Sequence, residues 1–364
     1  MSGVAPGRLR GTMRPQLKKV EDQVIVITGA SSGIGLVTAN LAAARGARVL
    51  LAARNETDLG RAVEGIRRRG GRAVYAAADV ADPEDVERIA ETVVREYGRI
   101  DTWVNNAAVA LYGRLMDLPV ADMRRQFDVN YWGQVHGSRA AIPHLRRQGG
   151  ALINVASALA DRAIPLQGNY CAAKHALRAF TETLRMELEA EGAPIAVTLV
   201  KPASIDTPFF EKARTYLEFE PQPVPPVYAP EIVADAILHC AIHPMRDVFV
   251  GGAARVIGAA NVVPRLADLY MERTLFEAQR TDIPVTAARA DNLFEPVEHD
   301  GGERGRTWRG RTKGTSLYTT AALRPRLTAA AMLGAAALGG LTYFKFKGQS
   351  SKFKVESSEL SSTV

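Results

Sequence analysis

A glycine-rich turn between a strand-like and a helix-like segment constrains the fold more than any other feature. Residues 24–28 form an uninterrupted apolar, largely β-branched run, typical of a parallel strand buried on both faces. Gly-Ala-Ser-Ser-Gly-Ile-Gly follows at 29–35, and helical periodicity then continues to Arg45. Glycines let a backbone approach a pyrophosphate closely, and the amides that begin the helix point at its negative charge. The order of elements therefore predicts a dinucleotide-binding loop, whose expected contacts are Gly29, Ser31, Ser32, Gly33, Ile34 and Gly35.

Strand-like and helix-like segments keep alternating along the chain, which predicts an α/β fold. Two of the helical stretches carry an unusual residue. The helix expected over 119–147 contains Asn130 beside Tyr131 and Trp132, which suggests a buried amide that needs partners. The helix expected over 256–279 contains Pro264, where we expect a kink. The further strands are expected at 48–53, 73–78, 100–104, 151–155, 195–200 and 247–250.

The second expected strand ends at Arg54, where an NAD-binding fold would present an acid to the ribose hydroxyls. Arginine can instead pair with the 2′-phosphate of NADP, with help from the nearby serine hydroxyls of the glycine loop. An ordinary surface arginine at a strand end is the alternative. A basic residue at this position favours NADP over NAD as the cofactor.

Tyr170 and Lys174 lie four residues apart in a stretch of helical periodicity from 168 to 191, so they share one helix face. A nearby ammonium favours the anion of a phenol and would lower the pKa of Tyr170 into a range useful for proton transfer. Ser157 follows the apolar run at 151–155, and catalytic groups of open α/β sheets collect at the carboxyl ends of strands. The three residues form a candidate catalytic group, although a tyrosine and a lysine at this spacing are by themselves common.

Composition excludes some classes of partner. The chain has 364 residues, and its two cysteines, Cys171 and Cys240, are too few for a disulfide framework, so we expect reduced thiols and a cytoplasm-facing protein. The net charge of +7 comes from the ends, because residues 1–20 hold five basic and no acidic residues and residues 295–364 hold eleven and six. Residues 21–294 then carry −3. No nucleic-acid partner is expected.

Over about residues 20–255 the sequence resembles the short-chain dehydrogenase/reductase family. The motifs are Thr28-Gly-x-x-x-Gly-x-Gly35, Asn105-Asn-Ala-Ala, Asn130, Ser157 thirteen residues before Tyr170, and Tyr170-x-x-x-Lys174. Ala108 and Ala203 depart from the glycines that the family often has at these positions. The resemblance implies a Rossmann-type doubly wound parallel sheet in one catalytic domain with a C-terminal extension.

The same resemblance implies roles for the matching residues. Tyr170 would exchange a proton with the substrate oxygen, Ser157 would hydrogen-bond that oxygen, and Lys174 would hold the nicotinamide ribose and lower the pKa of Tyr170. Asn130 would anchor a water relay. The remaining cofactor contacts implied are Asp79 and Val80 at the adenine, Asn105 at a strand end, and Thr207 at the carboxamide.

Together these features predict an NADP(H)-dependent oxidoreductase that interconverts a carbonyl and an alcohol on a small lipophilic substrate. NAD(H) dependence within the same fold and a catalytically silent cofactor-binding scaffold are the alternatives. A homo-oligomer is compatible with the family pattern. Aromatic residues between 209 and 227 suggest a substrate lid, with packing on the body as the alternative. No metal site is expected.

The ends of the chain suggest five regions. These are a disordered basic arm (1–19), which has an organellar transit peptide as its alternative, the catalytic domain (20–290), a flexible linker (291–326), an uncharged stretch (327–344) and a polar tail (345–364). The uncharged stretch has 18 residues, and basic residues flank it on both sides. It favours a transmembrane anchor with the catalytic domain on the cytoplasmic side, and a helix docked on the protein is the alternative.

Overall fold

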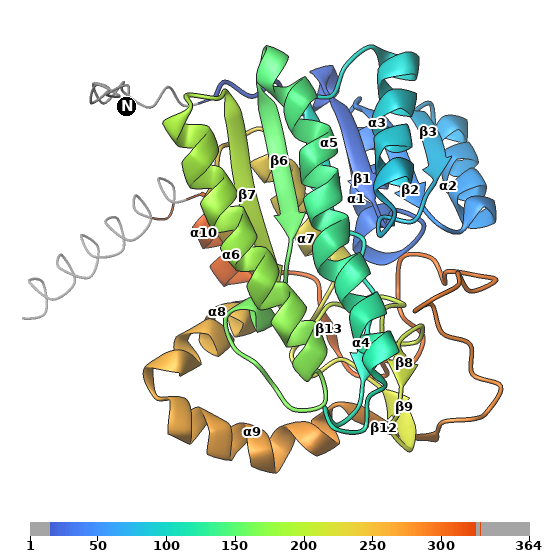
Figure 1. Cartoon of the computed structure of the whole chain (residues 1–364), viewed down its shortest axis with the longest axis vertical. Coiled ribbons are helices and arrows are strands. Elements are labelled where there is room, and N and C mark those ends of the chain that lie inside the picture. The colour runs from blue at the N-terminus through green and yellow to red at the C-terminus, as the bar shows by residue number, and fades with distance from the viewer. Residues whose placement is uncertain (1–14, 325–327, 329–364) are drawn as a thin grey trace, which may run out of the picture. The chain divides into compact units, whose positions relative to one another are not determined.

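The computed structural model describes residues 15–324 and Thr328. A compact unit ends at Thr319, beyond the boundary expected at residue 290. Its centre is a seven-stranded parallel sheet, which confirms the α/β, Rossmann-type fold class (Figure 1). The strands are β1 (Val24–Thr28), β2 (Arg48–Ala53), β3 (Arg72–Ala77), β4 (Thr102–Asn105), β6 (Gly150–Val155), β7 (Ile195–Pro202) and β11 (Asp247–Val250).

The strand order in the sheet is β11-β7-β6-β4-β1-β2-β3. Successive strands are added first on one side of β1 and then on the other. The chain runs outward from β1 through β2 to β3, and then returns to pair β4 with the other side of β1. Connections on the two sides of this switch point lead to opposite faces of the sheet, which leaves a crevice at the carboxyl ends of the strands. Ligands of open α/β sheets bind in such a crevice.

Helices cover both faces of the sheet. Helix α1 contacts α2 and α7, whereas α3 contacts α5, and α6 contacts the turn that precedes α5. The interior of the sheet is fully buried, with Val26, Leu50 and Trp103 all at 0% or near 0% exposure. The helices are α1 (Gly33–Ala44), α2 (Glu56–Arg68), α3 (Pro83–Tyr97), α5 (Gly133–Gln148), α6 (Gly168–Ala190) and α7 (Pro230–Cys240).

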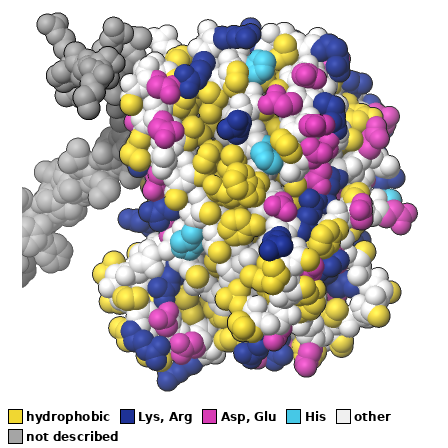
Figure 2. Space-filling view, in the orientation of Figure 1, with side chains coloured by type: hydrophobic (Ala, Val, Ile, Leu, Met, Phe, Trp, Pro, Cys, Tyr) yellow, Lys and Arg dark blue, Asp and Glu magenta, His cyan; other side chains and the backbone are white. Residues whose placement is uncertain are grey.

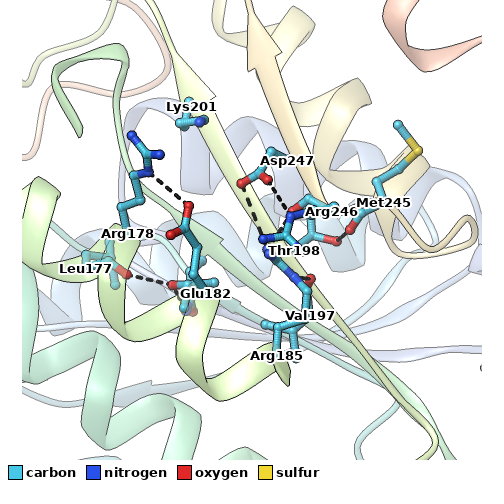
Figure 3. A network of polar contacts seen from close by, with 12 residues as sticks. Leu177, Arg178, Glu182, Arg185, Val197, Thr198, Lys201, Met245, Arg246 and Asp247 are labelled. Carbon is cyan, nitrogen blue, oxygen red and sulfur yellow. Dashed lines mark hydrogen bonds and ion pairs between the residues drawn. The ribbon is translucent and has the colours of Figure 1, made fainter. Parts of the chain in front are cut away.

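Helix α6 is fixed to the sheet edge by a polar network (Figure 3). The guanidinium of Arg185 donates to the carbonyl oxygens of Val197 (2.9 Å) and Arg246 (2.7 Å), and Thr198 Oγ1 donates to the carbonyl of Met245 (2.6 Å). A buried guanidinium with backbone acceptors holds its helix in one position, since sliding would leave those polar groups unpaired. The network therefore sets the position of the helix that carries Tyr170 and Lys174.

The long helix expected over 119–147 is present but interrupted by a change of pitch. It runs as α4 (Val120–Phe127), a π-helical turn (Asp128–Trp132) and α5. Asn130 lies in the π turn at 0% exposure, so the prediction of a buried amide is confirmed. Single π turns widen a helix locally and occur frequently at functional sites.

The prediction of one kinked helix over residues 256–279 is wrong. Two helices, α8 (Gly252–Ala259) and α9 (Pro264–Ala278), are separated by a short 3₁₀ turn. Pro264 is the first residue of α9, and Val263 before it has φ −129° and ψ 64°. Proline disfavours the helical conformation in the residue before it, so here it begins a new helix.

Residues 291–313, expected to be a flexible linker, instead lie on the body. Strand β13 (Thr312–Lys313) pairs with β10 (Val227–Tyr228), and Leu293 is fully buried. The linker prediction relied on glycine and charge, but several of those charges pair with the body, as Asp300 does with Lys212. The basic arm is similarly fixed at its end, where Lys18 forms an ion pair with Asp101 at 2.5 Å.

Two further short strand pairs and a further helix occur among the described residues. Strand β5 (Leu111–Tyr112) pairs with β8 (Arg214–Thr215), and β9 (Phe219–Pro221) pairs with β12 (Arg280–Pro284). Helix α10 spans Leu317–Leu323. Among the described residues, no helix has both the length and the apolar character needed to cross a bilayer. The predicted anchor at 327–344 lies outside the described residues except for Thr328.

Hydrophobic side chains gather on the outer face over α5 and α6 (Figure 2). Trp132, in the π turn before α5, is 47% exposed, and Tyr131 packs edge-on to Phe180 with ring centroids 6.3 Å apart. Exposed apolar patches of this kind are common at protein interfaces. The homo-oligomer stays a prediction.

Candidate active site

The glycine loop joins β1 to α1 in a conformation that only glycine accommodates at two positions. Gly29 has φ +65°, and a Cβ there would lie 2.7 Å from Ala107 Cα. At Gly35 a Cβ would lie 2.2 Å from the carbonyl oxygen of Gly29. Ser32 is the residue immediately before α1. The loop therefore turns tightly and presents the first amides of α1 at the carboxyl end of β1, as the sequence predicts.

A cavity of about 670 Å³ opens at the carboxyl ends of the strands, a volume that suits a cofactor and a small substrate. Most residues predicted for the site lie around it. Three do not line it: Gly35, Asn105 and Asn130. The predicted residues that do line it are Gly29, Ser31, Ser32, Gly33, Ile34, Arg54, Asp79, Val80, Ser157, Tyr170, Lys174 and Thr207.

Asn105, expected as a cofactor contact, is instead a buried link between elements. Its Nδ2 donates to Asn154 Oδ1 (2.9 Å) and its Oδ1 accepts from the indole of Trp103 (2.8 Å). Asn106, the next residue, lines the cavity and ties its side chain to the carbonyl of Thr28 (2.9 Å). Side chains alternate between the two sides of a strand, so one position separates a structural asparagine from one at the site.

The predicted catalytic side chains meet at the carboxyl end of β6. The Ser157 hydroxyl is close enough to that of Tyr170 to lower its pKa, and Lys174 Nζ lies 5.6 Å from the centroid of the Tyr170 ring. The same ammonium donates to the carbonyl oxygen of Val155 at 3.0 Å. Tyr170 and Lys174 come from the first two turns of α6, as their spacing predicts. All three residues line the cavity, so they can act on one bound molecule.

Burial dominates the acid–base behaviour of this group. Burial raises the pKa of Tyr170, and the hydrogen bond from Ser157 lowers it by a smaller amount. Burial also lowers the pKa of Lys174 to about 7. Burial therefore opposes the expected lowering of the Tyr170 pKa by Lys174, because a buried lysine loses its charge more readily.

Asn130 acts on the site through its neighbours. Its Oδ1 accepts from the backbone N–H of Val109 (2.8 Å), and its Nδ2 donates to the Val109 carbonyl (2.9 Å). One side chain thus satisfies both buried polar groups of a residue that lines the cavity. The role in a water relay stays a prediction.

The C-terminal segment lines one end of the cavity, which the sequence did not predict. The guanidinium of Arg54 donates to the carbonyl oxygens of Phe294 (2.7 Å) and Asn292, and Gly33 N–H donates to Gly302 O (2.8 Å). Asn292 and Asp300 line the cavity. Burial lowers the pKa of Arg54. The cation is thus held at the end of β2, facing the cavity.

The aromatic segment after β7 both lines the cavity and packs on the body. Phe209 and Phe210 line the cavity, and they also pack against a buried cluster that includes Tyr112. The Phe209 ring lies edge-on to Tyr170 at 5.9 Å. Strands β8 and β9 fix the rest of this segment, which was expected to be irregular. Movement as a lid stays a prediction.

Comparison with known proteins agrees with this architecture. The family model described as short chain dehydrogenase matches residues 23–217. An uncharacterized oxidoreductase of Bacillus subtilis, YxnA, is 47% identical over 325 residues, covering 88% of this chain and 90% of that protein. The putative oxidoreductase SadH of Mycobacterium tuberculosis is 32% identical and covers 71% of this chain and 95% of its own length.

Among solved structures, an alcohol dehydrogenase from the archaeon Thermococcus sibiricus, complexed with 5-hydroxy-NADP, superposes with a TM-score of 0.56. It is 26% identical and covers 63% of this chain and 95% of its own chain. The sheet, the glycine loop and the Ser157–Tyr170–Lys174 group define a Rossmann-type oxidoreductase. The chain belongs to the short-chain dehydrogenase family.

Three residues that line the cavity were not predicted from the sequence: Lys212, Asn292 and Asp300. Lys212 lies five residues after Thr207, in the segment considered only for its aromatic residues. Glu211 precedes it and Arg214 follows two residues later, so no local pattern singles it out. Asn292 and Asp300 lie in the stretch assigned to a linker, and no local pattern marks them.

Proposed function

We propose that the protein is an NADP(H)-dependent oxidoreductase that interconverts a carbonyl and an alcohol on an apolar substrate. The observation that carries this proposal is the convergence of Ser157, Tyr170 and Lys174 on a cavity that also contains the glycine loop and Arg54. All the groups required for proton transfer are present. This favours turnover over a silent scaffold.

The residues present fit a dinucleotide. Gly29 and Gly35 have no room for a Cβ, which keeps the loop tightly turned, and the start of α1 favours the charge of a pyrophosphate. Arg54 would pair with a 2′-phosphate, Lys174 would hold the nicotinamide ribose, and Thr207 would contact the carboxamide. Asp79 and Val80 would lie at the adenine. A bound cofactor of this kind supplies or accepts the hydride.

The protein's own groups manage the proton. In the reducing direction, the Tyr170 hydroxyl would give its proton to the substrate oxygen while Ser157 donates a hydrogen bond to that oxygen. Protonated Lys174 would stabilise the tyrosinate that results, because an adjacent cation favours the anion of a phenol. Substrate oxidation would run the same steps in reverse.

The substrate end of the cavity is apolar. A carbonyl compound with a hydrophobic body would bury its surface there, leaving the oxygen to find Ser157 and Tyr170. The apolar lining residues are Leu159, Ile164, Phe209, Phe210, Val256, Ile257, Met271 and Leu275.

The direct test measures consumption of NADPH and of NADH, separately, with a panel of lipophilic ketones, aldehydes, steroids and retinoids. We expect turnover with at least one apolar carbonyl compound, and faster consumption of NADPH. Turnover with NADH alone would favour the NAD(H)-dependent alternative. Tight binding of NADPH without turnover on any panel member would favour the scaffold.

The reduction rate should depend on pH through Lys174. Its pKa is lowered to about 7 by burial, whereas that of Tyr170 is raised, so Tyr170 keeps its proton throughout the neutral range. We expect kcat/KM for reduction to be level below about pH 7 and to fall above it, as Lys174 loses the charge that stabilises the tyrosinate. Lys174→Met should be slow and lack this decline. A wild-type profile that is flat from pH 6 to pH 9 would contradict the role given to Lys174.

A membrane anchor at 327–344 remains part of the proposal for the full chain. Fractionation of the full-length protein should be compared with a form truncated after Arg324, which keeps α10. We expect only the full-length form to stay with membranes after carbonate extraction. Release of both forms by carbonate would rule out the anchor and favour the docked helix.

A further inference from the structure

Lys212 places a buried cation beside the glycine loop. Its side chain is 12% exposed, and its Nζ donates to Ser32 Oγ (2.8 Å) and to Asp300 Oδ1 (2.9 Å). Asp300 is 8% exposed. An ammonium has three N–H donors, and the described residues accept from two of them. Lys212 comes from the segment expected to be a substrate lid, and Asp300 comes from the stretch expected to be a linker.

Lys212 and Arg54 belong to one cluster. Asn292 links them, because its carbonyl accepts from the Arg54 guanidinium and its N–H donates to the carbonyl of Lys212 (3.0 Å). Burial lowers the pKa of Lys212; the charge of Asp300 opposes this, and that of Arg54 adds to it. Burial likewise lowers the pKa of Arg54, and the charges of Asp79 and Asp300 oppose it. Both cations therefore interact with the same carboxylate.

Buried cations need a nearby anion, because an unpaired charge in a low-dielectric site is costly. Asp300 supplies that anion to Lys212. Two cations and the Ser32 hydroxyl, all lining the cavity near the end of β2, are also the donors that suit a phosphate monoester. The fold meets the adenosine ribose of a dinucleotide at this strand end.

We propose that Lys212 is a second 2′-phosphate-binding residue beside Arg54, and that Asp300 is an internal anion whose place the phosphate takes. This proposal rests on the NADP(H) preference proposed above. NADP(H) brings a phosphate that replaces Asp300 as the partner of Lys212. NAD(H) brings none, so the ion pair between Lys212 and Asp300 persists when it binds.

The proposal predicts opposite effects for the two partners. Lys212→Met removes a charge-assisted contact and should weaken NADP⁺ binding about 10- to 100-fold, with NAD⁺ binding changed less than about threefold. Asp300→Asn removes the competing negative charge but keeps a polar side chain beside Lys212. It should tighten NADP⁺ binding, by about threefold or more, and leave NAD⁺ binding nearly unchanged.

The experiment is calorimetric titration of the full-length protein with NADP⁺, NAD⁺, adenosine 2′-monophosphate and adenosine 5′-monophosphate. The 2′-monophosphate should follow NADP⁺ across the variants, and the 5′-monophosphate should follow NAD⁺. Lys19→Met is the matched control, since Lys19 is 79% exposed and its loss changes the net charge equally. It should bind all four ligands as the wild type does.

A second pair of variants guards against misfolding, because Lys212→Met leaves Asp300 buried without its partner. Asp300→Asn and the double variant Lys212→Met/Asp300→Asn differ only at Lys212, in a background without the carboxylate. The double variant should bind adenosine 2′-monophosphate about tenfold more weakly than Asp300→Asn. Equal affinities in this pair would overturn the assignment of Lys212, and weaker NADP⁺ binding by Asp300→Asn would overturn the role of Asp300.

Failure of this inference is distinguishable from failure of the proposed cofactor preference. If the wild type binds NADP⁺ more tightly than NAD⁺ but Lys212→Met weakens both equally, Lys212 is not a 2′-phosphate ligand and the preference stands. If the wild type binds NADP⁺ no more tightly than NAD⁺, the preference itself is wrong, and both proposals fall.

Discussion

Tyr170→Phe should lower the rate of carbonyl reduction by about 10²- to 10⁴-fold, the usual contribution of a positioned general acid. The substitution removes the hydroxyl and keeps the ring, which packs edge-on against Phe209 with centroids 5.9 Å apart. NADPH binding should therefore stay within about threefold of wild type. The measurement is single-turnover oxidation of bound NADPH with a substrate found in the panel.

Tyr112 offers a matched control. It is a fully buried tyrosine near Tyr170, and its hydroxyl has no hydrogen-bond partner among the described residues. Tyr112→Phe removes the same atom from the same residue type, so it should retain wild-type turnover and be equally or more stable. Wild-type rates in Tyr170→Phe, or an equal loss in both variants, would show that the Tyr170 hydroxyl does not transfer the proton.

Arg54→Asp should weaken NADPH binding by about 10²-fold or more while changing NADH binding much less. The substitution exchanges a charge-assisted contact with the 2′-phosphate for repulsion. The Kd for each cofactor is obtained by titrating the fluorescence of the reduced nicotinamide. The ratio of the two constants is the diagnostic quantity.

Arg54 also holds the C-terminal segment, so its loss has a structural consequence that needs its own control. Arg125 donates to the carbonyl of Leu293 in the same segment (3.0 Å) but does not line the cavity. Arg125→Gln should loosen the segment and leave the ratio of NADPH to NADH affinity near that of wild type. An equal loss for both cofactors in Arg54→Asp would mean that Arg54 only anchors the segment.

Sequence periodicity predicted the features that depend mainly on residues close together in the chain. The strand at 24–28 and the glycine loop after it were found as expected, because burial on both faces and tight turns leave direct marks on residue type. Tyr170 and Lys174 lie a turn apart on α6, because helical geometry alone fixes that relation. Ser157 at the carboxyl end of β6 followed from the parallel sheet.

Tertiary structure decided which neighbour of a pair faces the cavity and how ionisable groups behave. Asn106 rather than Asn105 lines the site, because the end of β4 directs Asn105 into the buried contacts with Trp103 and Asn154. The spacing of Lys174 from Tyr170 suggested a lowered tyrosine pKa. Burial of the two side chains instead raises the pKa of Tyr170 and lowers that of Lys174, and burial is a property of the whole fold.

Local sequence patterns could not predict the cluster around Arg54. Lys212 and Asp300 are 88 residues apart, and Arg54 reaches the carbonyl of Asn292 across 238 residues. Glycine and charged residues near position 300 by themselves predict a linker, because a charged segment has little apolar surface to bury against the catalytic domain. Here paired charges and backbone hydrogen bonds hold it instead. Which partners they find depends on the path of the whole chain.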